Sequence, residues 1–372
     1  MSSIHFTTQR CTATEYCITD AWAAVFSEWS ARTEAARDCA RLVLLSDETV
    51  WTHYESDIRA GLHCIDRTLL PLIIPPGEDA KDFQRLSAMA GHLEKHGVHR
   101  RDLLVCFGGG VCCDLGGFLA QIYMRGLNYI LLPSSLMAQI DAAIGGKVGA
   151  NFGLRKNLLG GFHHPLLVVI DSVFLTSLPQ FHFRTALAEA VKLGIICDEE
   201  LLTEVLGRQS KPLLDRQTEA VRQLVERCVR TKLELLRGDP YENELNRVLN
   251  LGHGVAHAIE RLPIMPGGLQ PCHGEAVAIG LAATARYSYR AGFCDERRSR
   301  QLIEILKGLG LPVSADCVDP EMLLGQLRRI REHRGGLFRL VVPTFEQGVR
   351  IVPEADLDLL AACLQELPEV DS

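Results

Sequence analysis

The stretch Leu103–Leu115, LLVCFGGGVCCDL, decides how the first half of this chain folds. Its opening residues are apolar and predict a buried strand, which ends in the glycine triplet Gly108–Gly110. A glycine turn after a strand lets the backbone come close to a pyrophosphate. The spacing is not that of GxGxxG, so an ordinary connection between strand and helix is the alternative to a dinucleotide turn.

Other apolar runs flank this strand and alternate with segments of helical periodicity such as Lys81–His96. Strands separated by helices predict a parallel sheet with helices on both faces. The expected strands, besides Leu103–Phe107, are Leu42–Leu45, Leu72–Ile74, Tyr129–Leu132 and Leu167–Ile170.

The pattern changes after Leu178-Pro179. Between residues 184 and 298 the apolar residues recur at helical spacing and strand signals vanish. Two further helices are expected at Ser299–Leu309 and Pro320–Ile330, followed by a short β segment at Leu337–Pro343. We therefore predict an α/β domain with a parallel sheet over residues 1–180 and an α-helical domain over residues 181–372.

Composition limits the class of protein. The chain has 372 residues, of which 47% are hydrophobic and 23% charged, enough for two domains with sizeable cores. The net charge of −7 argues against a nucleic-acid partner. No apolar run reaches the ~18 residues of a membrane span, and the start MSSIHFTTQR lacks the apolar core of a signal peptide. The 13 scattered cysteines then indicate reduced thiols in a cytoplasmic protein.

Polar side chains near the ends of the expected strands and beside the glycine turn are candidates for dinucleotide binding. Hydroxyl groups could bind a phosphate or a ribose, and a carboxylate directly after the first strand could bind an adenosine ribose. The alternative for each residue is a turn or a helix cap. These candidates are Asp47, Glu78, Lys81, Asp114, Ser134 and Ser135.

The segment Asp141–Asn157, DAAIGGKVGANFGLRKN, is read as a glycine-rich loop. Lysines on such a loop are suited to holding a phosphate as point charges. Lys147 and Lys156 are the lysines of this loop, and Arg125 in the motif YMRG is another candidate phosphate ligand. The alternative is that these cations are solvated surface residues.

Three segments supply a candidate ligand set for a divalent metal ion. Glu189, His253 and His273 give one carboxylate and two imidazoles, which suits a catalytic site with an open position. His257 lies one helical turn after His253, so the sequence alone leaves open which histidines bind metal. Lys192 lies three residues after Glu189, on the same helical face, where a plain ion pair is the alternative.

Seven motifs together resemble the sugar-phosphate cyclase superfamily, whose best-known member is 3-dehydroquinate synthase. They occur in the family's order between about residue 70 and about residue 290. They read GGGVCCDLGGF, YMRG, LPSSLMAQIDAAIGGKVGAN, KNLLGGFHHP, LAEAVKLGII, LNLGHGVAHAIE and HGEAVAIG. The resemblance implies an NAD-binding α/β domain followed by an α-helical metal domain, in a homodimer that acts on a sugar phosphate.

The resemblance also assigns roles to residues. It implies that Glu189, His253 and His273 hold Zn²⁺ or Co²⁺. It implies that Arg125 reaches the phosphate in the partner subunit's site. NAD contacts are implied for Asp47, Glu78, Lys81, Gly109, Gly110, Asp114, Ser134, Ser135, Lys156, Ser177 and Leu178. Substrate and catalytic contacts are implied for Asp141, Lys147, Asn157, Lys192, Lys232, Asn250 and His257.

The reaction that the resemblance implies is a redox cycle closed within one active site. A secondary hydroxyl is oxidised by NAD⁺, phosphate leaves by elimination, the hydride returns, and an intramolecular aldol closes a carbocycle. NAD is thus recycled, and the metal acts as a Lewis acid. Cationic side chains stabilise the charge that develops on enolate and phosphate.

The chain departs from 3-dehydroquinate synthases where these bind the substrate carboxylate. An arginine four residues before Asn250 is replaced by Asn246, and Arg247 would point elsewhere on a helix. The late Asp-Lys-Lys stretch of the family is also missing, and the sequence there reads Ile330-Arg331-Glu332-His333-Arg334. His182 stands where the family usually has a glutamate. A neutral amide replaces a charge-assisted contact poorly, so these changes favour a substrate without a carboxylate.

Sedoheptulose 7-phosphate is such a substrate, and it would yield a valiolone-type product for cyclitol biosynthesis. Two features point the other way: cyclases of that kind tend to carry proline at the position of His257 and often lack the GGK of Gly145–Lys147. A 3-dehydroquinate synthase is therefore the alternative. A 2-deoxy-scyllo-inosose synthase and a metal-dependent polyol dehydrogenase fit less well.

Overall fold

The computed structural model describes residues 12–153, 155–242, 247–263, 270–316, 318–333, 335–345 and 348–365. It divides into two compact units, Met1–Ser177 and Leu178–Ser372, and the division falls directly before α6 (Gln180–Cys197).

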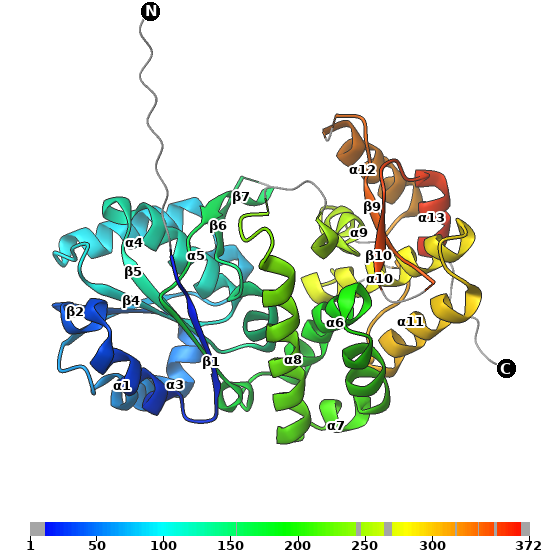
Figure 1. Ribbon diagram of the computed structural model, residues 1–372. Coiled ribbons are helices and arrows are strands. Elements are labelled where there is room, and N and C mark those ends of the chain that lie inside the picture. The colour runs from blue at the N-terminus through cyan, green and yellow to red at the C-terminus, as the bar shows by residue number, and fades with distance from the viewer. Residues whose placement is uncertain are drawn as a thin grey trace, which may run out of the picture. The chain divides into compact units, whose positions relative to one another are not determined.

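The first unit is a three-layer α/β structure built on a six-stranded sheet (Figure 1). Its strands pair in the order β1-β8-β5-β4-β2-β3, and every described pair is parallel. All five expected strands are confirmed, and β1 is an additional one. The strands are β1 (Glu15–Thr19), β2 (Arg41–Asp47), β3 (Thr68–Ile74), β4 (Leu103–Gly108), β5 (Asn128–Pro133) and β8 (Leu167–Asp171).

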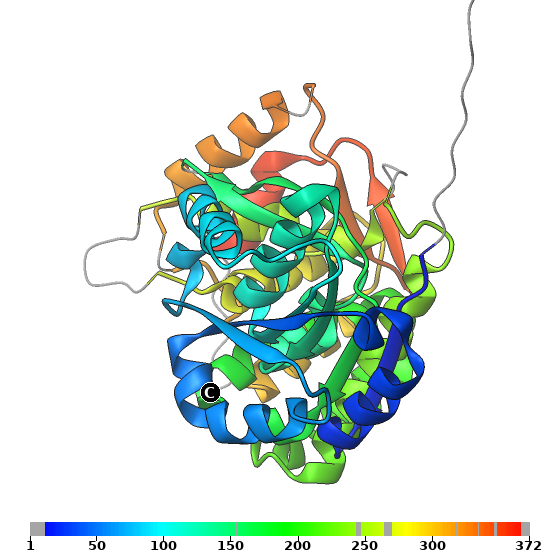
Figure 2. The ribbon, with the colours of Figure 1, turned by 90° about the vertical axis from the view of Figure 1, so that its left-hand side faces the viewer.

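Helices cover both faces of this sheet, as the alternation of the sequence predicts (Figures 1 and 2). On one face, strand residues such as Leu44 pack with Phe26 and Ile58 in a buried apolar cluster. On the other face, Gly116 lies against Cys106 and Leu45. The helices are α1 (Trp22–Arg32), α2 (Glu34–Arg37), α3 (Glu48–Leu62), α4 (Phe83–Lys95) and α5 (Gly110–Ile122).

The interpretation of residues 141–157 as a loop is wrong over much of its length. A short π-helical turn, η3 (Ala138–Ala142), is followed by an antiparallel hairpin of β6 (Lys147–Phe152) and β7 (Arg155–Phe162). Gly149 lies opposite Gly160 in that hairpin, and a Cβ on Gly160 would come within 2.4 Å of the carbonyl oxygen of Val148. Glycines have low strand propensity and remove the apolar alternation, which is why the hairpin was not predicted.

Every described element of the second unit between residues 184 and 298 is a helix or helical turn, as predicted. Its central helix is α10 (His273–Arg290), in which 14 of 18 residues are buried. The expected β segment near residue 340 is confirmed as β9 (Leu340–Pro343), with an unpredicted antiparallel partner, β10 (Val349–Val352). The other elements are α6, η5 (Leu201–Arg208), α7 (Ser210–Leu214), α8 (Thr218–Leu236), η6 (Val248–Asn250), α9 (His253–Ile259), α11 (Glu296–Gly308), α12 (Pro320–His333) and α13 (Leu357–Gln365).

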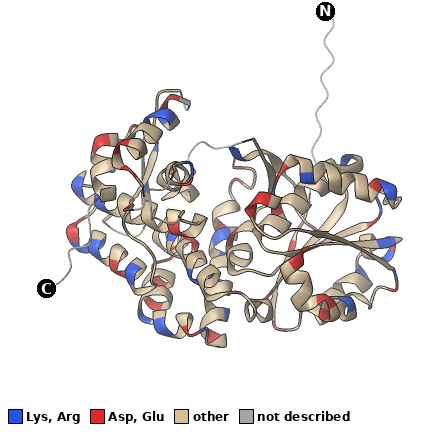
Figure 3. Ribbon diagram, turned by 180° about the vertical axis from the view of Figure 1, so that it is seen from behind, with Lys and Arg blue, Asp and Glu red and all other residues tan. Residues whose placement is uncertain are grey.

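Charged residues of both signs alternate along the helices of this unit (Figure 3). On α8, Glu226 lies between Arg222 and Arg230 and forms ion pairs with both, at 3.6 and 2.8 Å. Such exposed pairs one turn apart stabilise a helix by about 0.3–0.5 kcal/mol each. None of the described helices is long and apolar enough to cross a bilayer.

Candidate active site

The three residues predicted to bind a metal ion lie together in the second unit. Glu189 comes from α6, His253 begins α9 and His273 begins α10. The Nε2 atoms of His253 and His273 are 3.4 and 3.5 Å from Oε1 of Glu189, and one ligand atom of each residue lies within 4.8 Å of the others. Two ligands ~2.0–2.1 Å from one tetrahedral metal ion are about 3.3–3.4 Å apart, so the spacing suits such an ion.

The carboxylate of Glu189 supports this fit. Both of its oxygens are buried and lack a hydrogen-bond partner of good geometry among the described residues, although Lys192 forms an ion pair with Oε2. Burial opposes ionisation, but the ammonium of Lys192 and the imidazole of His253 outweigh it and hold the pKa of Glu189 well below its usual range. A buried carboxylate that stays charged and faces two imidazole nitrogens is a hard ligand prepared for a cation.

The two histidines differ in their protonation. Burial, together with Lys192, lowers the pKa of His253, so its imidazole is neutral at neutral pH. Burial also opposes a proton on His273, but Glu189 and Glu260 outweigh burial and raise its pKa to about 10. A metal ion that binds there must displace this proton, because a ligating imidazole is neutral.

Outer partners fix the orientation of both imidazoles. Nδ1 of His253 lies 3.1 Å from the carbonyl oxygen of Leu251, and Nδ1 of His273 lies 3.2 Å from Oε1 of Glu260. In each ring the Nε2 atom is therefore left to face the metal position. Glu260 was not predicted as a site residue, although it belongs to the motif LNLGHGVAHAIE. The only signal in the sequence was its place three residues after His257.

Two glycines bring the elements that carry these ligands into close contact. Gly274 packs against α6, where an added Cβ would lie 2.1 Å from the carbonyl oxygen of Thr185. Gly280 packs against the turn before α9, where a Cβ would lie 2.1 Å from the carbonyl oxygen of Gly252. Gly252 itself has a φ of 76°, which disfavours other residues. The positions of the predicted metal ligands thus depend on close contact between backbones.

Other predicted residues of the second unit lie on elements next to this cluster. Lys192 is buried one turn after Glu189, and Lys232 is buried on α8. His257 is half-exposed on α9, with its ring centroid 5.7 Å from that of His253, and Asn250 is exposed at the end of η6.

The region around Arg247 is not the α-helix assumed in the comparison with Asn246. Arg247 has φ and ψ of −87° and 84° and precedes the short 3₁₀ turn η6, so the argument from a 100° helical rotation is wrong there. Its guanidinium donates a hydrogen bond of 3.2 Å to the carbonyl oxygen of Glu242. Asn246 lies outside the described residues. So does Arg334, the last residue of the segment 330–334 that lacks the family's Asp-Lys-Lys stretch.

In the first unit the glycine turn joins the end of β4 to the start of α5. Gly109 is the N-cap and Gly110 the first helical residue, so backbone N–H groups of the first helical turn are available for an anion. A Cβ on Gly109 would lie 3.4 Å from Oγ of Ser135, and the Ser134 amide donates to the carbonyl oxygen of Gly108 over 2.9 Å. The structure thus places the predicted glycines and the Ser134-Ser135 pair side by side.

Next to the glycine turn, α5 carries Asp114, which has a charged partner. Lys81 forms an ion pair with Asp114. Burial works against the charge on Lys81, but Asp114 and Glu78 outweigh it and raise its pKa. Asn151 of β6 donates to Oε1 of Glu78 over 2.9 Å, and its Oδ1 accepts from the Asn157 amide over 2.8 Å. Asn151 was not predicted and connects a residue predicted for NAD with one predicted for substrate.

Two other candidates, Asp47 and Ser177, form hydrogen bonds within the fold, as expected of residues in a helix cap or a turn. Asp47 caps α3, accepting from the Val50 amide over 3.0 Å, although its second carboxylate oxygen faces the start of α5 near Cys112. Ser177 accepts a hydrogen bond of 2.9 Å from the hydroxyl of Tyr54.

The remaining candidates lie at the start of the second unit and on the segment 138–162. Leu178 is the first residue of the second unit. Lys147 starts β6, and Asp141 lies in η3; Lys156 and Asn157 are exposed on β7.

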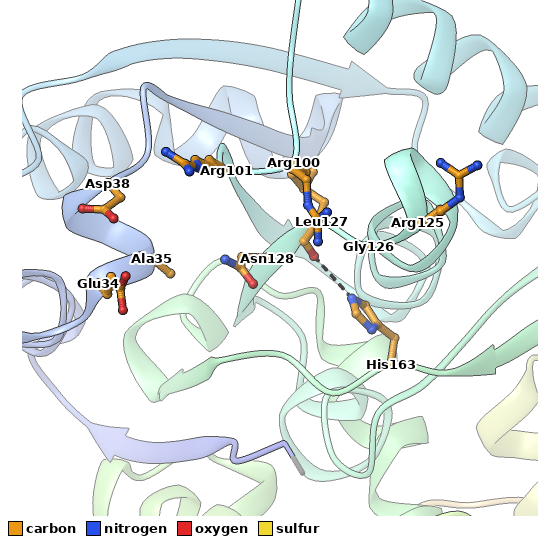
Figure 4. Close-up of a pocket in the computed structure, with 10 residues that line it drawn as sticks. All are labelled: Glu34, Ala35, Asp38, Arg100, Arg101, Arg125, Gly126, Leu127, Asn128 and His163. Atoms are coloured by element: carbon orange, nitrogen blue, oxygen red, sulfur yellow. Dashed lines mark hydrogen bonds between the residues drawn. The ribbon is translucent and has the colours of Figure 1, made fainter. Parts of the chain in front are cut away.

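Arg125 lies apart from these residues. It ends the turn before β5, at the opposite end of that strand from Ser134, and lines a pocket of about 420 Å³ (Figure 4). Arg100 and His163 line the same pocket, whose other side is acidic. Arg125 has a φ of 66°, a strained value for a residue other than glycine. Its predicted reach into a partner subunit stays a prediction.

The fold and the clustered residues define a two-domain protein with a glycine turn in an α/β unit and a metal-type ligand set in a helical unit. The model of the 3-dehydroquinate synthase N-terminal domain matches residues 71–185, and that of its C-terminal domain matches residues 186–332. The chain belongs to the 3-dehydroquinate synthase family and is a sugar-phosphate cyclase of that family.

Two relatives show how it stands within the family. A 2-epi-valiolone synthase from Stigmatella aurantiaca is 37% identical over 320 residues, covering 83% of this chain and 77% of the relative. A 3-dehydroquinate synthase from Pelobacter propionicus is 35% identical over 301 residues, covering 81% of this chain and 83% of the relative. Overall identity therefore does not separate the two activities.

A solved structure confirms the fold class. It is ValA, a 2-epi-5-epi-valiolone synthase from Streptomyces hygroscopicus subsp. jinggangensis with NAD⁺ and Zn²⁺ bound. It is 26% identical to this chain, with a TM-score of 0.85, and the match covers 97% of this chain and 98% of that one.

Proposed function

We propose that this protein converts sedoheptulose 7-phosphate into a valiolone-type carbocyclic ketone, using NAD and Zn²⁺ or Co²⁺. The observation that carries the reaction class is the cluster of buried Glu189 with partly buried His253 and His273 and their outer partners. Relatives of both activities support the class, and one of them binds NAD⁺ and Zn²⁺. We further propose a cytoplasmic homodimer in cyclitol biosynthesis, in which Arg125 serves the partner subunit.

The metal ion would be held by residues of the second unit, and NAD by residues of the first unit together with Leu178. Glu189, His253 and His273 would hold the metal ion, and the start of α5 with Gly109 and Gly110 would hold the NAD pyrophosphate. The remaining residues proposed for NAD are Asp47, Glu78, Lys81, Asp114, Ser134, Ser135, Lys156, Ser177 and Leu178. When bound, NAD supplies a reversible hydride acceptor and the metal ion a Lewis acid for the substrate oxygens.

The chain's own residues would handle charge and protons. Lys147, Asp141 and Asn157 would bind and orient the sugar phosphate, with Asn250 contributing an amide. Lys192 and Lys232 are buried ammonium groups that would stabilise negative charge as it develops on the substrate. His257 has its Nδ1 3.1 Å from Oε2 of Glu260, which leaves Nε2 to exchange a proton with a substrate hydroxyl.

The choice of substrate rests on the region where the family binds a carboxylate. Asn246 offers no positive charge there. The neighbouring Arg247 is not helical, and its guanidinium is bonded to the carbonyl oxygen of Glu242. A substrate carboxylate would therefore meet a neutral amide, and removing an ion from water without a charged partner is costly. Sedoheptulose 7-phosphate carries no carboxylate.

Phosphate release with product mass analysis tests this proposal. Purified protein with NAD⁺ and Co²⁺ receives sedoheptulose 7-phosphate or 3-deoxy-arabino-heptulosonate 7-phosphate in separate reactions. We expect phosphate and a carbocyclic ketone from sedoheptulose 7-phosphate only, without net NADH. Turnover of the heptulosonate would make the protein a 3-dehydroquinate synthase, and stoichiometric NADH would make it a polyol dehydrogenase.

A substitution tests the substrate argument separately. Asn246→Arg restores the charge found in 3-dehydroquinate synthases, so we expect kcat/KM for the heptulosonate to rise relative to that for sedoheptulose 7-phosphate by about tenfold or more, the gain expected of a charge-assisted contact. An unchanged ratio would mean that residue 246 does not face the substrate. Asn246→Gln, which keeps a neutral amide, is the matched control.

A further inference from the structure

The hairpin of β6 and β7 is irregular where it carries predicted ligand-binding residues. Its regular pairing stops at Ala150 and resumes at Phe152. Between these two pairs β6 contributes Asn151 alone, whereas β7 contributes three residues, among them Lys156 and Asn157. Such bulges are frequent beside active sites, where they change the direction of a side chain. The bulge therefore decides how one residue predicted for NAD and one predicted for substrate are presented.

The side chain of Asn151 fixes the backbone of this bulge. Its Oδ1 accepts a hydrogen bond of 2.8 Å from the amide N–H of Asn157. Asn157 has a φ of 51°, a left-handed value that glycine adopts freely and other residues adopt at a cost of about 1–2 kcal/mol. The hydrogen bond to Asn151 stabilises that conformation and so sets the direction of the Asn157 side chain.

The two N–H groups of Asn151 bind the segment before α4. Its backbone N–H donates to the carbonyl oxygen of Lys81 over 2.7 Å, and its Nδ2 donates to Oε1 of Glu78 over 2.9 Å. The rings of Phe83 and Phe152 meet edge to face beside these bonds, with their centroids 6.1 Å apart. Two residues predicted for NAD are thus bonded to the residue that holds the bulge.

An amide side chain suits both contacts of residue 151. The N–H of Asn157 can only donate and the carboxylate of Glu78 accepts, so one end of the side chain must be an oxygen and the other an N–H group. An aspartate at this position keeps the acceptor but loses the donor, and it places one carboxylate against another.

We propose that Asn151 is a positioning residue that couples NAD binding to binding of the sugar phosphate. NAD bound at Glu78 and Lys81 fixes their segment, and Asn151 transmits this order to the bulge that presents Asn157. A phosphate group held at the bulge orders the same link from the other side, so each ligand binds more tightly when the other is present. This coupling rests on the proposed function, which assigns Glu78 and Lys81 to NAD and Asn157 to the sugar phosphate.

The ratio of NAD⁺ dissociation constants without and with saturating inorganic phosphate measures the coupling. It is obtained by isothermal titration of the zinc-loaded protein. We expect a ratio of about five or more in wild type, the lower end of usual coupling between two sites, and less than about two in Asn151→Asp. Asn128→Asp makes the same change at an exposed residue that starts β5 and belongs to no predicted site, and it should keep the wild-type ratio.

Reversing the hydrogen bond separates coupling from stability. Glu78→Gln alone keeps an acceptor for Nδ2 of Asn151, and the double variant Glu78→Gln with Asn151→Asp lets the introduced amide donate to the introduced carboxylate. We expect the ratio to be kept in Glu78→Gln, whatever the absolute NAD⁺ affinity, and restored in the double variant. If Asn151 only stabilises the hairpin, Asn151→Asp weakens the binding of each ligand alone and leaves the ratio unchanged.

The wild-type measurement alone can overturn the proposal: a ratio of one does so, whether or not the variants fold. A wild-type ratio in Asn151→Asp, or a double variant that stays uncoupled, overturns it as well. Both heptulose phosphates carry the phosphate group. Turnover of 3-deoxy-arabino-heptulosonate 7-phosphate would therefore overturn the proposed substrate and leave the coupling in place.

Discussion

The metal cluster of the helical unit and the glycine turn of the α/β unit are built in opposite ways. In the first, side chains make the site: a buried carboxylate and two imidazoles, each oriented by an outer partner. In the second, backbone makes it: the N–H groups at the start of α5, left accessible by Gly109 and Gly110. Truncating a side chain should therefore damage the metal cluster directly, whereas at the glycine turn a methyl group added at Gly110 should block the ligand directly.

Glycines occur in both regions but serve different ends. Gly274 and Gly280 allow backbones to touch inside the helical unit, where a Cβ would collide at 2.1 Å. Gly110 has only ordinary contact at 3.5 Å, with Ala142. A Cβ on Gly110 therefore fits the protein, and the predicted approach of NAD to the backbone would account for glycine there.

Loss of a metal ligand should have the largest effect. His273→Ala removes one of three ligands, and the two that remain do not hold a divalent ion in a tetrahedral site. We expect zinc affinity to fall by more than the ~10–100-fold that loss of an outer partner costs, with turnover abolished and NAD binding kept. Metal analysis, phosphate release and NAD titration measure the three quantities.

His63→Ala is the control, because His63 is exposed at the end of α3 and belongs to no predicted site. It should retain wild-type metal content and turnover. Full activity of His273→Ala with unchanged metal content would remove His273 from the site.

Adding a methyl group at Gly274 should rank second. A Cβ 2.1 Å from the carbonyl oxygen of Thr185 must push α10 away from α6 and so move His273 relative to Glu189. We expect Gly274→Ala to lower the free energy of unfolding by about 1–3 kcal/mol, as overpacking does, and to weaken zinc binding as well. Chemical denaturation and chelator competition measure these effects.

Gly325→Ala makes the same change on α12, where no atom lies within 4 Å of the added Cβ. It should stabilise the protein by up to about 1 kcal/mol, because alanine loses less entropy in a helix. If Gly274→Ala behaves like Gly325→Ala, close packing of α6 and α10 is not what positions His273.

A third prediction separates structure from binding within the glycine turn. Gly110→Ala should leave stability nearly unchanged but weaken NAD binding by about tenfold or more, since the methyl group occupies space that a pyrophosphate needs. Gly108→Ala should instead destabilise the fold by about 1–3 kcal/mol, because its Cβ would lie 2.5 Å from Sγ of Cys112. Isothermal titration with NAD⁺ and thermal unfolding distinguish the two variants.

Equal NAD affinity in Gly110→Ala and wild type would show that the glycine turn is only a connection between β4 and α5. That outcome would remove the contrast between a site made of backbone and a site made of side chains.

The sequence predicted elements where local pattern and packing agree. Five strands of the parallel sheet are continuous apolar runs, and each is confirmed. β1 was missed because Glu15–Thr19 is short and mixes polar with apolar residues, and it is held by pairing with β8 far along the chain. The hairpin of β6 and β7 was missed because its facing glycines conceal any alternation.

The same limit applies to the candidate site. Glu189, His253 and His273 were predicted from residue type and from the family resemblance, and the structure brings them together. Glu260 and Asn151 act through contacts with residues on other elements, and spacing along the chain does not encode such contacts. The assumption of a helix at Arg247 failed because a 3₁₀ turn begins there, and short turns have no periodicity to read.

The smallest expected effect on ligand binding concerns how the helices that carry the site residues are joined. Asp198 follows α6 and accepts two hydrogen bonds of 2.8 Å from Arg227 of α8, and another of 3.0 Å from the hydroxyl of Thr231, which precedes Lys232. Burial opposes its charge, but Arg227 and these hydrogen bonds outweigh burial and lower the pKa of Asp198. Asp198→Asn should cost about 1–3 kcal/mol at neutral pH, the range for a lost hydrogen bond to a charged group.

The lowered pKa of Asp198 determines how its contribution to stability changes with pH. A carboxylate whose pKa is depressed by folding stabilises the protein above its unfolded pKa of about 3.9, and this stabilisation is lost as pH falls towards the folded pKa. The difference in unfolding free energy between wild type and Asp198→Asn should therefore be constant above about pH 5 and shrink below about pH 4. Glu204→Gln, which breaks an exposed pair with Arg208, should change stability by less than about 0.5 kcal/mol at any pH. A pH-independent difference for Asp198→Asn would mean that the charge of Asp198 does not join α6 to α8.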